Sequence, residues 1–146
     1  VQVMSAGTGI THSEFNAHET EPVSLLQIWV FPNQKEVKPR YDQMKLDLSA
    51  RKNKFQQIVS PNPDDDGVWI HQNAWFHLAD MDQNLELEYA LKDKMNGVYV
   101  FVIKGSVQIN DETLEERDGM GIWNIEKLDI KAVRDAEILL MEVPMR

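Results

Sequence analysis

Hydrophobic and polar residues alternate along this chain in short runs, a pattern typical of β-strands. The clearest run is Leu85–Leu91, in which apolar and polar residues alternate with a period of two. A strongly apolar run, Ser24–Phe31, lies between two prolines, which often occur at strand ends. The pattern predicts strands at residues 1–4, 10–16, 24–31, 55–60, 68–79, 85–91, 98–103, 106–109, 127–132 and 136–143.

Turn residues separate most of these runs. Residue pairs that contain Asn, Asp or Gly predict hairpins or turns at residues 96–97, 104–105, 110–111 and 118–119. Residues 68–79 are predicted to form a strand pair with a tight turn at residues 72–73. Only residues 43–54 and 112–117 weakly favour a helix. The polar residues 33–43 read as a linker, and we place a domain boundary near residue 50. Short strands joined in this way predict an all-β fold, an antiparallel sandwich or jelly roll.

Composition narrows the possible functions. The chain has 146 residues, 42% of them hydrophobic, no cysteine and a formal net charge of −9. The acidic balance argues against nucleic acid, whose phosphates require clustered Lys and Arg. No run approaches the roughly 20 apolar residues that span a bilayer, and the absence of cysteine excludes disulfides and thiol catalysis. We therefore expect a cytoplasmic protein with enough apolar residues for a packed core, to which the four tryptophans are assigned by default.

The strongest chemical signal is the pair His12 and Glu14. On a strand, residues two apart point to the same face with their Cα atoms about 7 Å apart, so both side chains can reach one ion. A histidine nitrogen and a carboxylate oxygen suit zinc, iron or manganese, and they are part of the ligand set of non-haem iron oxygenases. An H-x-E tripeptide alone is a weak signal, and most such pairs lie on the surface or form salt bridges.

The other candidates have simpler explanations. His71 and His77 are about 20 Å apart on one unbroken strand, and they approach each other only if the chain turns between them. His18 lies among acidic residues in an expected loop. Residues 64–66 form an acidic cluster, but they lack the alternating ligands and distal Glu of an EF-hand and read as a solvated turn.

The beginning of the chain resembles the pirin family, whose members are bicupins. The match includes the Met-Ser-Ala-Gly stretch, the following Gly-Ile and the His-Ser-Glu triplet, and it extends more diffusely over the rest of the chain. Further matching segments are residues 25–30, 39–41, 70–72, 98–109 and 118–119. The resemblance implies a cupin or jelly-roll β-barrel: residues 1–50 as the C-terminal part of a metal-binding first cupin, and residues 51–146 as a complete second cupin.

The resemblance also implies a metal site. In this family three histidines and one glutamate hold one metal, commonly iron, and His12 and Glu14 would be the third and fourth ligands. The first two ligands form an H-x-H motif upstream, so we expect this chain to be a fragment. The family is linked to quercetin 2,3-dioxygenase activity, in which O₂ opens the ring of a flavonol substrate. In that reaction Glu14 would also act as the catalytic base.

The second cupin is expected to bind no metal. The general cupin motif ends with a glutamate ligand, six further residues and a glycine. If Gly105 is that glycine, the glutamate position is occupied by Val98. Upstream, residues 92–94 stand where the H-x-H pair of ligands is expected. With only two ligands, the chain alone is expected to have little or no dioxygenase activity, and to form a dimer or to associate with the N-terminal segment that it lacks. The alternative is a non-catalytic cupin that binds a regulatory protein partner, as eukaryotic relatives do.

Overall fold

The computed structural model describes residues 1–145, and their regular structure is almost entirely β. The elements are β1 (Gln2–Ser5), β2 (Arg40–Gln43), the 3₁₀ helix η1 (Leu48–Arg51), β3 (Gln56–Ser60), β4 (Val68–Trp69), β5 (Trp75–Met81), β6 (Glu86–Ala90), β7 (Asn96–Ile109), β8 (Glu112–Glu115), β9 (Gly119–Ile122) and β10 (Lys127–Pro144). This confirms the predicted all-β class. Among the described residues, no helix has the length and apolar character needed to cross a membrane.

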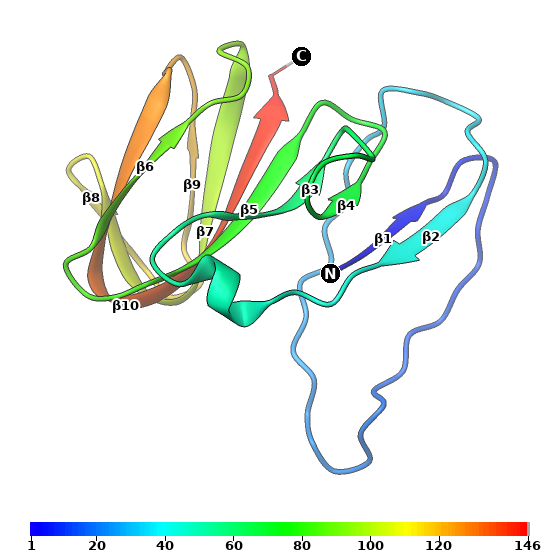
Figure 1. The fold of residues 1–146 in the computed structure, drawn as a ribbon, viewed down its shortest axis with the longest axis horizontal. Helices are drawn as coiled ribbons and strands as arrows, with labels where there is room; N and C mark the ends of the chain where they lie inside the picture. The colour runs from blue at the N-terminus through cyan, green and yellow to red at the C-terminus, as the bar shows by residue number, and fades with distance from the viewer. Residues whose placement is uncertain (146) are drawn as a thin grey trace.

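The two longest strands organise an eight-stranded sheet. β10 pairs in antiparallel fashion with β5, β6 and β7, and β7 pairs in turn with β8 and β9. The sheet is strongly curled, and β6, β8 and β9 lie toward the end of the molecule away from β1 and β2 (Figure 1). β1 and β2 form a separate two-stranded sheet beside β3 and β4, and a long loop joins them (Figure 1).

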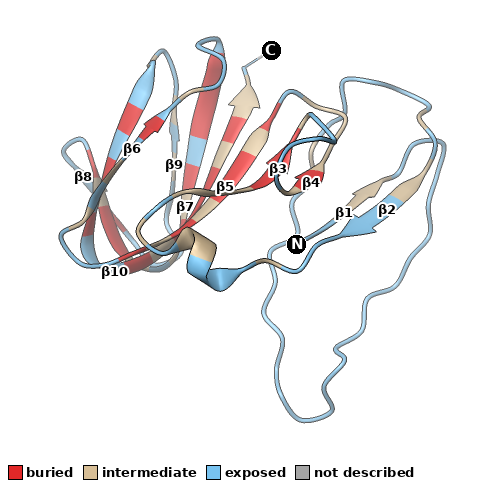
Figure 2. Ribbon diagram, viewed as in Figure 1, coloured by how far each residue is buried: buried red, intermediate tan, exposed pale blue. Residues whose placement is uncertain are grey.

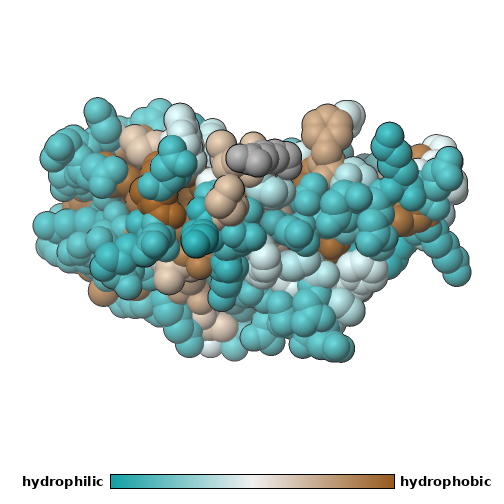
Figure 3. Space-filling view, turned by 90° about the horizontal axis from the view of Figure 1, so that it is seen from above, coloured by the Kyte–Doolittle hydropathy of each residue, from teal (hydrophilic) through white to brown (hydrophobic). Residues whose placement is uncertain are grey.

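Alternation along β10 explains where the core lies. Ile138 and Leu140 point into the barrel, where they pack with the buried valines of β7, and Leu139 points to the outer face with Phe76 of β5. Figure 2 shows the buried residues concentrated on β5, β7 and β10, whereas β1, β2 and their loop are mostly exposed. The face seen in Figure 3 is largely hydrophilic, with hydrophobic side chains in separate areas.

Several predicted elements of the second half are confirmed, among them β3, β6 and the hairpin between β7 and β8. The turn predicted at Lys104–Gly105 is wrong, because β7 continues through it and pairs with β10 on both sides. Gly105 has φ +82° at a register shift opposite Asp135, so it forms a bulge that bends a single strand. The weak helix prediction at 112–117 is also wrong, because residues 112–115 pair with β7 as β8.

The strand pair predicted at residues 68–79 is wrong in its pairing. β4 and β5 do not pair with each other, because β3 lies between them and pairs with β4 in parallel and with β5 in antiparallel fashion. The assignment of all four tryptophans to the core is also incorrect. Trp29 and Trp123 are 87% and 57% exposed, and only Trp69 and Trp75 are partly buried.

The first half departs most from the prediction. Residues 10–16 and 24–31 form no strand, whereas Arg40–Gln43, part of the expected linker, pairs with β1 as β2. A strand needs a hydrogen-bonded neighbour to be stable in water, and neither run has a ladder partner within residues 1–145. Between Ala6 and Pro39 the backbone forms one long loop (Figure 1).

Candidate metal-binding site

His12 and Glu14 lie in this long loop, and both are exposed to solvent. Because residues 10–16 form no strand, the expected reason for their convergence, a shared strand face, does not hold in this structure. Within residues 1–145, the His12 side chain is exposed and takes part in no hydrogen bond or ion pair. The His12 imidazole is therefore accessible to an ion.

The Glu14 side chain is attached to the first strand. The side-chain amide Nε2 of Gln2, on β1, donates a hydrogen bond to Glu14 Oε1. An ionised carboxylate can accept several hydrogen bonds, so Oε2 keeps its capacity to bind a cation. The contact links the loop to the β1–β2 hairpin across 12 residues of sequence.

The donor chemistry of this pair fits a divalent ion of the iron, nickel or zinc type. The described residues nevertheless contain no group of three or more His, Cys, Asp or Glu side chains arranged to hold a metal. Within residues 1–145, His12 and Glu14 therefore do not form a complete metal site.

The other histidines lie apart from this pair. His18 faces Glu21 at 3.9 Å in the same exposed loop. His71 follows β4 and packs its ring edge-on against Trp69, whereas His77 is buried on β5, with β3 lying between these two strands. The acidic residues 64–66 form an exposed turn, as predicted.

The interior of the barrel formed by the eight-stranded sheet contains a carboxylate that the sequence analysis missed. Glu142 on β10 is fully buried, directly opposite Val98 on β7. Its oxygens accept hydrogen bonds from the Tyr89 hydroxyl at 2.7 Å, the Asn96 side-chain amide at 2.8 Å, and the backbone N–H groups of residues 92 and 93 at 2.9 Å. These four donors occupy the carboxylate, so it acts as a structural anchor for the loop between β6 and β7.

Tyr89, which contacts this carboxylate, and His77, which packs against Tyr89, have pKa values that favour their neutral forms. Burial, together with the hydrogen bond to Glu142, raises the pKa of Tyr89 well above its usual value. Burial lowers the pKa of His77 to about 4, and the positive charge of Lys92 adds to the shift. The His77 ring packs edge-on against Tyr89 and Phe55, and its Nδ1 is buried without a hydrogen-bond partner. A neutral imidazole is therefore favoured at this position.

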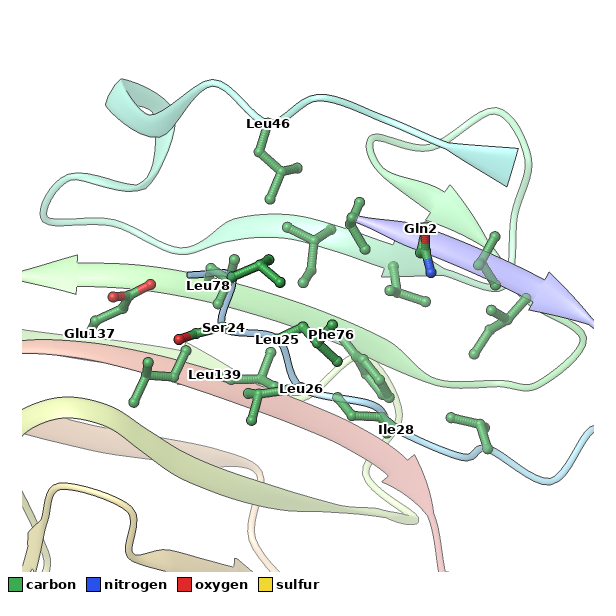
Figure 4. A pocket seen from close by; sticks show the side chains of 18 of the residues that line it. Gln2, Ser24, Leu25, Leu26, Ile28, Leu46, Phe76, Leu78, Glu137 and Leu139 are labelled. Atoms are coloured by element: carbon green, nitrogen blue, oxygen red, sulfur yellow. The ribbon is translucent and has the colours of Figure 1, made fainter. Parts of the chain in front are cut away.

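A large, mainly apolar groove lies between the N-terminal segment and the outer face of the barrel. Its volume is about 950 Å³. Figure 4 shows Leu25, Leu26 and Ile28 of the loop lying close to Phe76 and Leu139 of the barrel. Polar side chains, namely Lys104, Arg117 and Glu137, also line the groove.

A few polar contacts fasten the N-terminal segment to the barrel. The Arg40 guanidinium stacks on Trp69, with its central carbon 3.8 Å from the ring centroid, and it donates a hydrogen bond to the Trp69 carbonyl. The Gln72 side chain donates to the carbonyl of Phe31 at 2.7 Å. These contacts tie β2 and the end of the long loop to the region around β4.

The fold defines the class of protein. A curled, mostly antiparallel sheet, preceded by a two-stranded sheet whose connecting loop carries His12 and Glu14, is a cupin-type β-barrel with an additional N-terminal segment. A family model described as "Quercetinase C-terminal cupin domain" matches residues 57–143, and the model described as "Pirin" matches residues 1–30. The chain belongs to the pirin family of cupin proteins.

Curated relatives agree with this assignment. The chain is 37% identical over 147 residues to a protein of Escherichia coli K12 named quercetin 2,3-dioxygenase, a match that covers 98% of this chain and 60% of the relative. It is 34% identical over 143 residues to a pirin-like protein of Caulobacter vibrioides, covering 97% of this chain and 61% of that protein. The chain thus spans about three fifths of the length of these relatives.

Solved structures of one bacterial pirin match the whole described fold. The crystal structure of YhhW from Escherichia coli superposes with a TM-score of 0.89 at 34% identity, covering 98% of this chain and 59% of that one. A second structure, of YhhW in complex with nickel(II), gives a TM-score of 0.88 at 33% identity, covering 98% and 60%.

Proposed function

We propose that this chain forms the later part of a pirin-type bicupin. In this proposal residues 1–50 are the end of a metal-binding first cupin, and residues 51–146 are the second cupin. The two family models support it, because they match residues 1–30 and 57–143 separately. The share of the relatives that the chain spans also supports it, since about two fifths of their length has no counterpart here.

The proposed metal ligands are His12 and Glu14, and the proposed ion is divalent iron. The observation that carries the proposal is the accessible His–carboxylate pair inside the segment matched by the Pirin model. The nickel(II) complex of the relative YhhW supports a site for a divalent transition metal. When bound, such an ion acts as a Lewis acid toward an oxygen of the substrate.

The proposed activity of the intact protein is that of a quercetin 2,3-dioxygenase-type oxidoreductase acting on a flavonol, as the name of the Escherichia coli relative suggests. Glu14 is the proposed general base, which takes the proton of the flavonol hydroxyl group onto a carboxylate oxygen. Because residues 1–145 contribute only two of the ligands, we expect the isolated chain to have little or no turnover.

The partner that we propose is a polypeptide that completes the first barrel, either a second copy or the segment that carries the other ligands. The apolar groove and the exposed Phe15, Trp29 and Phe31, each at least 87% exposed, support such association. Analytical ultracentrifugation of the isolated chain should show a species heavier than 16.9 kDa. A strictly monomeric chain at high concentration would contradict self-association.

The activity is tested with the isolated chain and a separately produced N-terminal domain of the Escherichia coli relative. Quercetin consumption and iron content are measured for each alone and for the mixture, with Fe²⁺ present. We expect turnover only in the mixture, and loss of it in His12→Ala and Glu14→Gln. Turnover by the isolated chain with one equivalent of iron would overturn the incomplete site, and full activity of both variants in the mixture would overturn the ligand assignment.

A second candidate function is a non-catalytic cupin that binds a regulatory protein. The same exposed aromatic side chains favour it. The iron measurement distinguishes the two functions: a mixture that contains no stoichiometric iron and does not consume quercetin, but in which the chain binds a defined protein, favours the binding module.

A further inference from the structure

The candidate ligand Glu14 depends on one contact for its position. It lies in a loop without ladder partners, and within residues 1–145 its side chain makes a single hydrogen bond, which it accepts from Gln2 Nε2. Gln2 belongs to β1, which is paired along its length with β2. The bond is therefore the contact through which regular structure can orient the Glu14 carboxylate.

Gln2 is itself held from the neighbouring strand. It lies opposite Gln43 in the β1–β2 ladder, and the Met44 backbone N–H donates to the Val1 carbonyl at 2.9 Å, so the backbone is fixed on both sides of Gln2. The Tyr41 hydroxyl donates to Gln43 Oε1 at 2.5 Å and lies 3.5 Å from Gln2 Oε1. The oxygen of the Gln2 amide thus faces a hydroxyl, and its nitrogen faces the carboxylate.

We propose that Gln2 is a positioning residue for the metal-binding carboxylate, an inference that rests on the proposed function of Glu14 as a ligand. The amide N–H occupies Oε1, which directs Oε2 toward the ion and favours binding through one oxygen. A neutral donor suits this role, because Lys or Arg at the same place would repel the cation. Groups that hydrogen-bond to metal ligands typically change metal affinity by about 10–100-fold when removed.

The test compares Gln2→Leu with Gln34→Leu, a change at an exposed glutamine whose side chain forms no hydrogen bond within residues 1–145. The purified chain, labelled for NMR, is titrated with Ni²⁺, whose paramagnetism broadens resonances near the bound ion even when binding is weak. We expect the His12 and Glu14 side chains to broaden in the wild type. The apparent Kd should rise about tenfold in Gln2→Leu and stay unchanged in Gln34→Leu.

Two further measurements separate positioning from a general effect on folding. The melting temperature of the second barrel should be the same in both variants, because Gln2 lies outside that barrel. In the metal-free protein, the Gln2 side-chain amide resonances should move in Glu14→Ala, since the hydrogen bond is lost. This second measurement needs no Gln2 variant, so it applies even if Gln2→Leu disturbs the hairpin.

Failure of the proposed metal site and failure of the positioning role of Gln2 give different results. If Ni²⁺ does not broaden His12 and Glu14 in the wild type, or broadens other residues instead, the proposed metal site fails. If those side chains broaden but Gln2→Leu binds Ni²⁺ as tightly as the wild type, the positioning role alone is overturned. Unmoved Gln2 amide resonances in Glu14→Ala would overturn the positioning role as well.

Discussion

Replacing Glu142 with alanine should strongly destabilise the barrel formed by the eight-stranded sheet. The Glu142 carboxylate is fully buried on β10 and accepts four hydrogen bonds, which fasten the loop between β6 and β7. Truncation would leave the Tyr89 hydroxyl and the Asn96 amide buried without an acceptor. The two backbone donors, at partly exposed positions, could turn to water.

The magnitude follows from these donors. Leaving one buried neutral donor without its acceptor typically costs about 1–3 kcal/mol, because that donor stays desolvated. Two of the four donors can be rehydrated here, so we expect a loss of about 4 kcal/mol in the free energy of unfolding. Glu142→Gln keeps one acceptor oxygen but turns an NH₂ group toward the other donors, and should cost about 2 kcal/mol.

Urea denaturation followed by circular dichroism measures both variants, with Glu112→Ala, at an exposed position of β8, as the control. The urea midpoint should be highest for the control, lower for Glu142→Gln and lowest for Glu142→Ala, with an unchanged m-value. The melting temperature of Glu142→Ala should drop by on the order of 10 °C. Hydrogen exchange should rise first at residues 91–95. A loss below about 1 kcal/mol for Glu142→Ala would refute the anchoring role.

Three further predictions concern His77, Gly105 and Arg40. Because the folded-state pKa of His77 is lowered to about 4 from an unfolded value near 6.5, its contribution to stability is complete above pH 6.5 and is lost as the pH falls toward 4. That loss is about 3 kcal/mol, and urea titrations from pH 7 to 4 should show it in the wild type but not in His77→Leu. Gly105→Ala should cost about 3 kcal/mol in the same assay, because φ is +82° and a Cβ would lie 2.0 Å from the Asp135 carbonyl oxygen; a change within 0.5 kcal/mol would contradict this. Arg40→Ala removes the stack on Trp69 and should speed hydrogen exchange in β1 and β2 severalfold without moving the urea midpoint of the barrel, whereas unchanged exchange would contradict the fastening role.

The second half of the fold was predictable because each strand finds its partner within the chain. Residues 85–91 alternate clearly, and β6 pairs with β10 as a half-buried strand should. Lys104–Gly105 misled the prediction because glycine with positive φ serves equally for a hairpin turn and for a bulge, and only the long partner β10 distinguishes the two. Glu142 was recognisable in principle, since alternation along β10 places it on the same face as Ile138 and Leu140.

The candidate site was only partly predictable. The side-chain chemistry of His12 and Glu14 indicates a metal site independently of the backbone conformation. Their expected strand geometry was wrong, because an alternating pattern forms a strand only where a second strand pairs with it. The contact from Gln2 was hidden for a related reason. It joins residues 12 apart in sequence and depends on how the loop returns to β1.

The apolar Ser24–Phe31 segment bears on how the proposed metal site and the proposed association are coupled. Leu25, Leu26, Ile28 and Val30 line the groove on the barrel, whereas Trp29 and Phe31 do not line it and are 87% and 89% exposed. A run that is apolar on both faces is typical of a strand buried within a protein. If a partner polypeptide covers the outer face and also supplies the missing ligands, metal and partner must strengthen each other's binding by the same factor. Adding Ni²⁺ should then tighten the complex with the N-terminal domain of the relative, and His12→Ala should abolish this effect while leaving metal-free association intact; equal tightening in His12→Ala would show that association and the proposed site are independent.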